Sequence, residues 1–367
     1  MNDPCIASLA KILVNYSTEV RPGDWTVIHA DVIAMPLVRE VVRQALAAGG
    51  NPSLMIENDD WRELLLVEGS PEQLAWLAPT ETLVFERANV LIRIAASENT
   101  RALAQITPER QRQREQARGA LFETMRRSSA EGSLRWVYTE FPCAAFAQDA
   151  DMSLAGYENF AYGATFADQP DPVAACRAFY AEDDRRAGLL TGHRDVVVRG
   201  PDVDLRLSIA GRTFVNAAGR HNAPDGEIYT GPVEDSVNGW IRFSYPAVHS
   251  GCEVEGVEMT FEDGQVVRAA ARKNEPFLKE MLHTDPGAAY LGELGIGTND
   301  RIKRFTRRIL YDEKIGGSIH VAIGSGYPET GSRNRSRIHW DFICDMRRES
   351  EIRVDGEVIY RNGAFVV

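Results

Sequence analysis

The fold of the first half is decided by residues 25–57, which read W-T-V-I-H-A-D-V-I-A-M-P-L-V-R-E-V-V-R-Q-A-L-A-A-G-G-N-P-S-L-M-I-E. Trp25–Ala30 is a short apolar run typical of a strand, and Met35–Ala48 repeats its apolar residues at helical spacing. Two glycines follow directly, where helices commonly end. Ser53–Glu57 is the next β-type run. This order predicts a helical crossover between two parallel strands.

The rest of the N-terminal half continues this alternation. Asn89–Ala95 predicts a further strand, and we expect a helix near residues 100–106 after it. Residues 108–131 are rich in Arg, Gln and Glu, which is typical of a solvated helix. Leu134–Tyr138 predicts a strand, and residues 173–190 predict another helix.

The pattern changes near residue 195, where β-type runs with turn signals replace the helices. Val203–Ile209 alternates apolar and polar residues with the period of a half-buried strand. Residues 1–195 thus predict an α/β domain with a mainly parallel sheet, and residues 196–367 predict a mainly antiparallel β (α+β) domain that carries a metal site. Other runs and turns of the second domain are Asp195–Arg199, Cys252–Phe261, E-D-G at 262–264, Gln265–Ala271, Asp355–Gly356 and Asn362–Gly363.

Composition excludes several classes of function. The chain has 367 residues, 44% hydrophobic and 26% charged, with a net charge of −12. The negative charge argues against nucleic-acid binding, and no apolar run is long enough to predict a membrane helix. The first residues lack the features of a signal peptide, and the five scattered cysteines predict thiols in a reducing compartment. We expect a cytoplasmic protein that binds neither nucleic acid nor membrane.

The segment I-H-W-D-F-I at 338–343 places a histidine and a carboxylate two residues apart. In a strand His339 and Asp341 project to the same face, while Ile338, Trp340 and Phe342 face a core. Such a pair is half of a metal site. An ordinary hydrogen bond between the two on a solvent face is the alternative.

Three further segments carry similar residues in glycine-flanked, apolar surroundings. They are N-A-P-D-G-E-I-Y-T-G-P (222–232), L-G-E (291–293) and D-E-K-I-G-G-S-I-H-V-A-I-G-S-G-Y (312–327). Each charged residue alone is typical of a solvated surface, but buried carboxylates need a partner, and metal ions satisfy several at once. Carboxylates and imidazoles without cysteine suit Zn²⁺, Co²⁺ or Mn²⁺ in hydrolysis. The candidate ligands are Glu227, Glu293, Glu313, His320, His339 and Asp341.

With these motifs, in this order, the chain resembles the aminopeptidase T/aminopeptidase S family of dinuclear metallopeptidases. The resemblance is close in the C-terminal half and follows the N-terminal half in outline. It implies two divalent metal ions, with Glu293 bridging them and Glu313 at a further acidic position near them. It also implies a homodimer that acts on peptides with a free N-terminus. The N-terminal domain would shape substrate access and dimer contacts.

The resemblance also implies catalytic roles. Tyr327 matches a tyrosine beside the metals that would stabilise the oxyanion, and Glu313 is the best candidate to pass a proton to the leaving amine. One departure concerns the first motif, where the family carries two adjacent glutamates and this chain has Gly226 and Glu227. The role of the missing carboxylate is therefore open. His249 and Glu234 are expected to be structural.

Two alternatives stay open. His320, His339 and Asp341 form the two-histidine, one-carboxylate set of a non-haem Fe²⁺ ring-opening dioxygenase on a related scaffold. The additional carboxylates favour two ions and hydrolysis instead. A metal-stabilised binding protein without activity is the second alternative, because folds host unrelated functions. Nucleotide binding is disfavoured, since no G-x-G-x-x-G or Walker sequence follows a strand.

Overall fold

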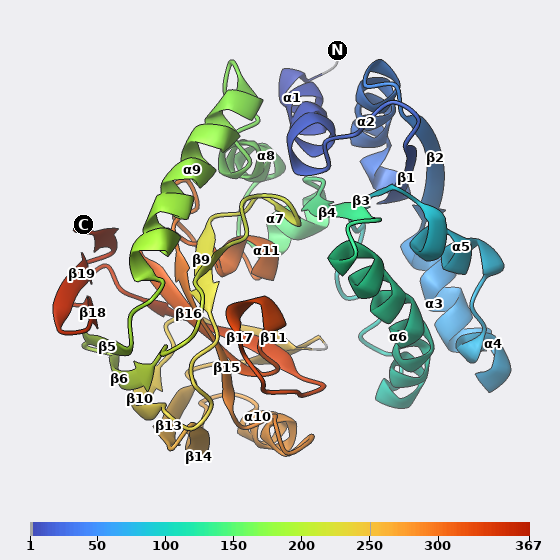
Figure 1. Cartoon of the computed structure of the whole chain (residues 1–367). Coiled ribbons are helices and arrows are strands. Elements are labelled where there is room, and N and C mark those ends of the chain that lie inside the picture. The colour runs from blue at the N-terminus through green and yellow to red at the C-terminus, as the bar shows by residue number, and fades with distance from the viewer. Residues whose placement is uncertain (1–2, 250) are drawn as a thin grey trace. The chain divides into compact units, whose positions relative to one another are not determined.

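A computed structural model describes residues 3–249 and 251–367 of the chain (Figure 1). By their contacts, these residues form two compact units. The first extends to Arg177 and includes Gly219–Pro224; the second comprises Ala178–Ala218 and Asp225–Val367. Helix α9 (Pro172–Leu190) contains the point where the first unit ends. The division into functional domains after residue 195 stays a prediction.

The first unit is built on a parallel sheet, as predicted. Its strand order is β2-β1-β3-β4-β8, and all four pairings are parallel. Val27 and Leu91 pack against α5 (Pro79–Arg87) and α6 (Pro108–Ala130) on one face. The strands are β1 (Trp25–Asp31), β2 (Asn51–Glu57), β3 (Val90–Ala95), β4 (Arg135–Glu140) and β8 (Asn222–Ala223).

The helices of this unit include several that sequence periodicity did not predict. Ser70 caps one of them with a full capping box to Gln73. The helix predicted near residues 100–106 is wrong, because hydroxyl and amide side chains there form turns instead: Ser97 accepts from the N–H of Asn99, and Asn99 from that of Arg101. The helical segments are α1 (Pro4–Ile12), η1 (Leu13–Ser17), η2 (Val32–Ala34), α2 (Met35–Ala47), α3 (Asp59–Glu68), α4 (Pro71–Ala75), α5 (Pro79–Arg87), α6 (Pro108–Ala130), α7 (Ala144–Asp149) and α8 (Leu154–Ala164).

The second unit contains two larger antiparallel sheets and a small hairpin, which confirms the predicted fold class. One sheet has the order β14-β13-β10-β6-β5-β18-β19-β20, and the other has the order β17-β16-β15-β9-β7. The first comprises β5 (Asp195–Gly200), β6 (Val203–Ser208), β10 (Asn238–Arg242), β13 (Glu258–Glu262), β14 (Gln265–Ala270), β18 (Glu351–Val354), β19 (Glu357–Arg361) and β20 (Ala364–Phe365). The second comprises β7 (Val215–Asn216), β9 (Glu227–Thr230), β15 (Leu291–Gly297), β16 (Ser318–Gly324) and β17 (His339–Asp345).

One predicted strand of this unit is divided in two. Cys252–Phe261 forms β12 (Cys252–Val254) and β13, because Gly256 adopts a left-handed conformation with φ +63° between them. Strand β12 pairs with β11 (Ala247–His249) in the hairpin. The remaining helical segments are α10 (Glu275–Leu282), α11 (Ile309–Asp312) and η3 (Pro328–Thr330).

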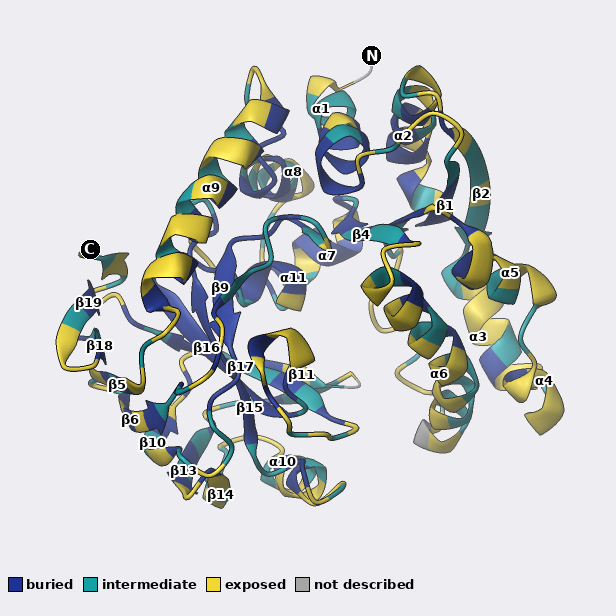
Figure 2. Cartoon of the chain, in the orientation of Figure 1, coloured by how far each residue is buried: buried dark blue, intermediate teal, exposed yellow. Residues whose placement is uncertain are grey.

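The two larger sheets share one hydrophobic core. Leu205 and Ile241 from one sheet and Val321 and Phe342 from the other belong to a single cluster of buried residues. Figure 2 shows β9, β15 and β16 deeply buried, so a polar side chain on these strands requires a partner. In the part of the chain described, no helix is long and apolar enough to cross a membrane.

Candidate metal centre

Four neighbouring strands of the five-stranded sheet, β17-β16-β15-β9, carry predicted ligands. Ala322 of β16 pairs with Glu293 on one side and with Asp341 on the other. Directly paired residues share a face of the sheet, so the two carboxylates project together across a small side chain. The two-residue period adds His320 and His339 to the same face.

Small residues make room for these large ligands. Glu227 pairs with Gly297, and His320 pairs with Gly295. A Cβ atom at Gly295 would lie 2.0 Å from Nε2 of His320, so another residue there would displace the imidazole. The alternating glycines after Glu293 therefore let the His320 ring extend across β15.

The ligand atoms converge on two groups that share one residue. Nε2 of His320 lies 3.1 Å from Oε2 of Glu227 and 3.2 Å from Oε1 of Glu293. Nε2 of His339 lies 3.5 Å from the other Glu293 oxygen and 3.6 Å from Oδ1 of Asp341. The groups are thus Glu227–Glu293–His320 and Glu293–His339–Asp341, each with ligand atoms within 4.8 Å of one another.

The donor set and its hydrogen bonding fit divalent cations. Oε2 of Glu293 and Nδ1 of His320 are buried and have no hydrogen-bond partner among the described residues. A buried carboxylate oxygen left in this way is destabilising by about 1–3 kcal/mol or more, and a cation between the ligands removes that penalty. His339 is oriented for the same purpose: its Nδ1 lies 2.8 Å from the carbonyl oxygen of Ser325, to which it can donate, leaving Nε2 directed at the carboxylates.

Electrostatics in the site are dominated by negative charge. Burial lowers the pKa of His320, but its hydrogen bonds to Glu227 and Glu293 outweigh burial and hold the pKa well above the usual value. For His339, Asp341 and Glu293 similarly overcome burial and raise the pKa to about 9. Burial raises the pKa of Glu293 itself. The face of the sheet thus attracts positive charge, as a metal site requires.

Glu313 and Lys314 approach the site from the end of α11. Lys314 is 0% exposed, lies 3.6 Å from Oε1 of Glu227 and forms a close ion pair with Glu313. Burial raises the pKa of Glu313 to about 8, with a further rise from Glu227 and Asp341 and an opposing effect from Lys314. Glu313 is in neither ligand group found among the described residues. Sequence reasoning assigned no role to Lys314, although the D-E-K segment contains it.

Tyr327 stands beside the second ligand group. Its ring centroid lies 5.0 Å from that of His339 and 5.4 Å from that of Tyr229. Although 41% of the residue is exposed, desolvation of the phenol and the charges of Glu293 and Asp341 raise its pKa above the usual range. Tyr327 is therefore a protonated hydrogen-bond donor at neutral pH.

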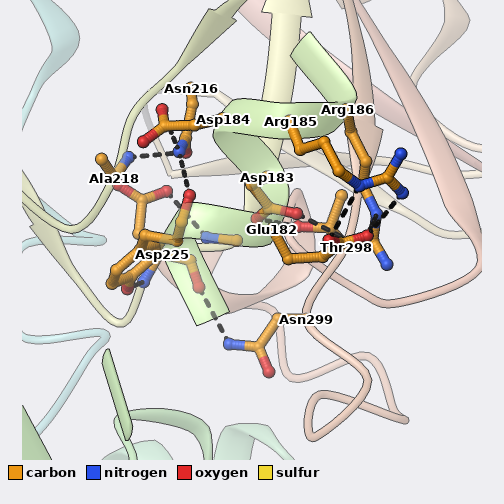
Figure 3. A network of polar contacts seen from close by, with 12 residues as sticks. Glu182, Asp183, Asp184, Arg185, Arg186, Asn216, Ala218, Asp225, Thr298 and Asn299 are labelled. Atoms are coloured by element: carbon orange, nitrogen blue, oxygen red, sulfur yellow. Dashed lines mark hydrogen bonds and ion pairs between the residues drawn. The ribbon is translucent and has the colours of Figure 1, made fainter. Parts of the chain in front are cut away.

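A buried polar network supports the strands that carry Glu227 and Glu293. Figure 3 shows Asp183 of α9 between Arg186 and Thr298, where it accepts hydrogen bonds of 2.9 and 2.7 Å. The backbone N–H of Thr298, directly after β15, donates to the carbonyl of Gly226 at 2.8 Å. The network thus fixes the segment that leads into Glu227 against the end of β15.

Gly226, which stands where the family carries the first of two adjacent glutamates, has a steric explanation. Gly226 has φ +136°, and a Cβ atom there would lie 2.5 Å from Cβ of Asn299. The Asn299 side chain donates to the carbonyl of Asp225 at 2.9 Å. A glutamate at position 226 would require Asn299 to move, which leaves Glu227 as the carboxylate of this motif in the ligand group.

Comparisons with known proteins identify the family of the chain. The sequence profile of the thermophilic metalloprotease (M29) family matches residues 2–365. The chain is 25% identical to aminopeptidase T of Thermus thermophilus, covering 98% of this chain and 95% of the relative. It is 26% identical to aminopeptidase AmpS of Bacillus subtilis, covering 96% of each.

Solved structures show the same fold. Wild-type AmpT from Thermus thermophilus superposes with a TM-score of 0.87 at 22% identity and 99% coverage of both chains. A 2,5-dihydroxypyridine dioxygenase from Pseudomonas putida gives a TM-score of 0.57 at 12% identity, covering 99% of this chain and 97% of the dioxygenase. Because the family profile spans nearly the whole sequence, the predicted membership is confirmed: the chain belongs to the thermophilic metalloprotease (M29) family and is a peptide hydrolase.

Proposed function

We propose that this metallopeptidase is an aminopeptidase that removes the N-terminal residue of peptides. The observation that carries the proposal is the pair of ligand groups joined by Glu293. They suit two divalent ions, Zn²⁺, Co²⁺ or Mn²⁺, held by Glu227, Glu293, His320, His339 and Asp341. When bound, such ions supply an activated water and positive charge that favours a free amine and a developing oxyanion.

The protein's own residues supply orientation and proton transfer. Tyr327 is protonated and adjoins His339, so it can donate to the developing oxyanion. We assign Glu313 the transfer of a proton to the leaving amine and, secondarily, contact with a metal. Lys314 holds the carboxylates of Glu227 and Glu313 in place through its ion pairs.

A single comparison of substrates tests exopeptidase selectivity. Amino-acid amides and dipeptides with a free amine should be hydrolysed by protein loaded with Co²⁺ or Zn²⁺, whereas their N-acetylated forms should be poor substrates. Matched pairs that differ only in the acetyl group control for side-chain preference. Equal rates on blocked and free substrates would sink the proposal and point to an endopeptidase.

The dioxygenase alternative is weakened by the geometry. His320 falls in one ligand group and His339 with Asp341 in the other, so among the described residues these three do not form one of the compact ligand sets. The dioxygenase likeness concerns the fold only. Metal analysis of protein purified under air and under nitrogen tests the point, since an iron requirement together with oxygen uptake would favour the alternative.

We further propose a cytoplasmic homodimer. The five cysteines, all in the described ranges, form no disulfide, which fits a reducing compartment. Several large apolar residues are exposed on β2 and around α3–α5, and exposed apolar surface favours association. Light scattering coupled to gel filtration should give twice the monomer mass, and Trp61→Glu should shift it toward the monomer. The exposed residues are Leu54, Trp61, Leu64, Val67, Trp76 and Leu83.

A further inference from the structure

A cavity of about 230 Å³ adjoins one of the two ligand groups, and none of the residue roles given above involves it. It is bordered by His339 and Asp341, while neither Glu227 nor His320 is in its lining. Its other walls come from β11, from the segment before α11, and from α11 itself. The cavity therefore lies at the His339–Asp341 end of the site, within the second unit.

Seven of the twelve residues that line this cavity are apolar. Val248 on β11 and Ile309 on α11 are 44% and 50% exposed, so these branched side chains have room for an apolar partner. Phe305 is fixed in the wall by stacking on Tyr245, with ring centroids 5.1 Å apart and planes 6° apart. An apolar group that entered would be stabilised in proportion to the apolar surface that it buries.

The charged groups in the wall are already engaged. Arg307 Nε lies 3.3 Å from a carboxylate oxygen of Glu253. Oδ1 of Asp312 accepts hydrogen bonds of 2.7 and 2.8 Å from the backbone and hydroxyl of Thr306. The ring of His249 lies 5.2 Å from that of Trp340. A charged substrate side chain would find no free counter-charge, and either sign would meet a like charge, Arg307 or Asp341.

We propose that this cavity is the specificity pocket for the side chain of the substrate's first residue, and that it selects neutral aliphatic or aromatic side chains. The proposal rests on the proposed aminopeptidase function. The carbon that bears the first side chain is bonded directly to the free amine. An amine held at the His339–Asp341 end of the site therefore places that side chain in the adjoining cavity. Val248 and Ile309 are the specificity-determining residues.

Filling the pocket tests the assignment. In wild-type protein, kcat/KM for leucine and phenylalanine amides should exceed that for lysine and glutamate amides at least about tenfold. Val248→Phe should lower kcat/KM for these two substrates roughly 10–100-fold relative to alanine amide. Val267→Phe is the matched control, because Val267 is a 52% exposed valine on β14, outside the cavity lining. It should leave the ratios unchanged.

Binding gives a second measurement that needs no turnover. L-leucinol and L-alaninol carry a free amine and no scissile bond, and calorimetric titration should show tighter binding of L-leucinol to metal-loaded wild type. Val248→Phe should remove this preference, and its melting temperature should match that of Val267→Phe.

Failure of this inference can be told apart from failure of the proposed function. If wild type cleaves no free-amine substrate, the aminopeptidase proposal falls, and with it the pocket. If wild type cleaves them but Val248→Phe leaves the leucine-to-alanine ratio unchanged in both assays, only the pocket assignment is overturned. If Val248→Phe instead changes preference for the second residue in Ala-X dipeptides, the cavity holds that residue and the assignment is likewise overturned.

Discussion

Two histidine–glutamate clusters, one in each unit, differ in how their charge is balanced. In the first unit, Nε2 of His29 lies 2.9 Å from one carboxylate oxygen of Glu57, and the Arg62 guanidinium lies 2.8 Å from the other. The Arg118 guanidinium lies 3.9 Å from the oxygen that faces His29. Burial raises the pKa of Glu57, but these neighbours outweigh it and hold the pKa well below the usual range. Both oxygens of Glu57 therefore have nearby partners, including the cations Arg62 and Arg118.

The cluster in the second unit, by contrast, is incompletely paired. Glu227, Glu293, Glu313 and Asp341 face one lysine and two histidines, and Oε2 of Glu293 has no hydrogen-bond donor among the described residues. Similar residue types thus pair around Glu57 in one unit and leave a buried oxygen of Glu293 without a hydrogen-bond donor among the described residues in the other. That oxygen, rather than the presence of His and Glu, distinguishes the metal site from the structural network.

Removing the shared carboxylate should have the largest effect. Glu293→Gln should reduce kcat/KM by roughly 10³-fold or more, because both ligand groups lose the residue that joins them. Elemental analysis should show bound metal falling further than in His339→Ala or Asp341→Ala, each of which damages one group. Glu57→Gln is the matched control and should change neither metal content nor turnover. Full metal content in Glu293→Gln would contradict the site.

Removing the buried cation should destabilise the metal-free protein. Lys314→Met leaves Glu227 and Glu313 without their ion-pair partner, and breaking a buried pair in this way costs about 3–5 kcal/mol. Arg62→Met, at a 44% exposed side chain of the first-unit cluster, should cost less than about 1 kcal/mol. Urea unfolding at low ionic strength measures both. Equal losses in the two variants would show that the clusters do not differ as described.

Replacing Tyr327 tests catalysis separately from metal binding in the second cluster. Tyr327→Phe should lower kcat roughly 10²–10³-fold, the typical effect of losing one oxyanion donor, while metal content and melting temperature stay unchanged. A tyrosine that only packs against His339 and Tyr229 would be replaced by phenylalanine with little effect. Unchanged kcat would therefore remove Tyr327 from the mechanism.

Sequence periodicity recovered much of the fold because the central elements are regular. The β1–α2–β2 unit and the paired projection of His339 and Asp341 both follow from spacing within one segment. Helices α3–α5 were missed because many of their apolar residues are exposed, so no clean amphipathic stripe marks them.

The site was predictable in residue type more than in geometry. Glu227, Glu293 and His320 come together only through the register of three different strands, which local spacing does not specify. Lys314 was missed for a related reason. A lysine beside a glutamate is ordinary on a surface, and only its complete burial among carboxylates sets it apart.

Asp183, in the buried polar network that supports β9 and β15, should make the free energy of unfolding depend on pH in the opposite sense from Glu57. Burial raises the pKa of Asp183 to about 6, despite its hydrogen bonds from Thr298 and Arg186. A carboxyl whose pKa is raised by folding favours the folded state at low pH, and this contribution is lost as pH rises from about 4 to about 6. The loss is on the order of 2–3 kcal/mol, since one pKa unit corresponds to about 1.4 kcal/mol.

Asp183→Asn removes this titration, so urea unfolding at intervals from pH 4 to pH 7 should show wild type losing stability relative to the variant across that interval. Glu57→Gln is the control of opposite sign: the pKa of Glu57 is lowered by folding, so wild type should gain stability relative to that variant as pH rises through the acidic range. Parallel pH profiles for wild type and Asp183→Asn would show that Asp183 is charged throughout and that its two hydrogen bonds outweigh burial.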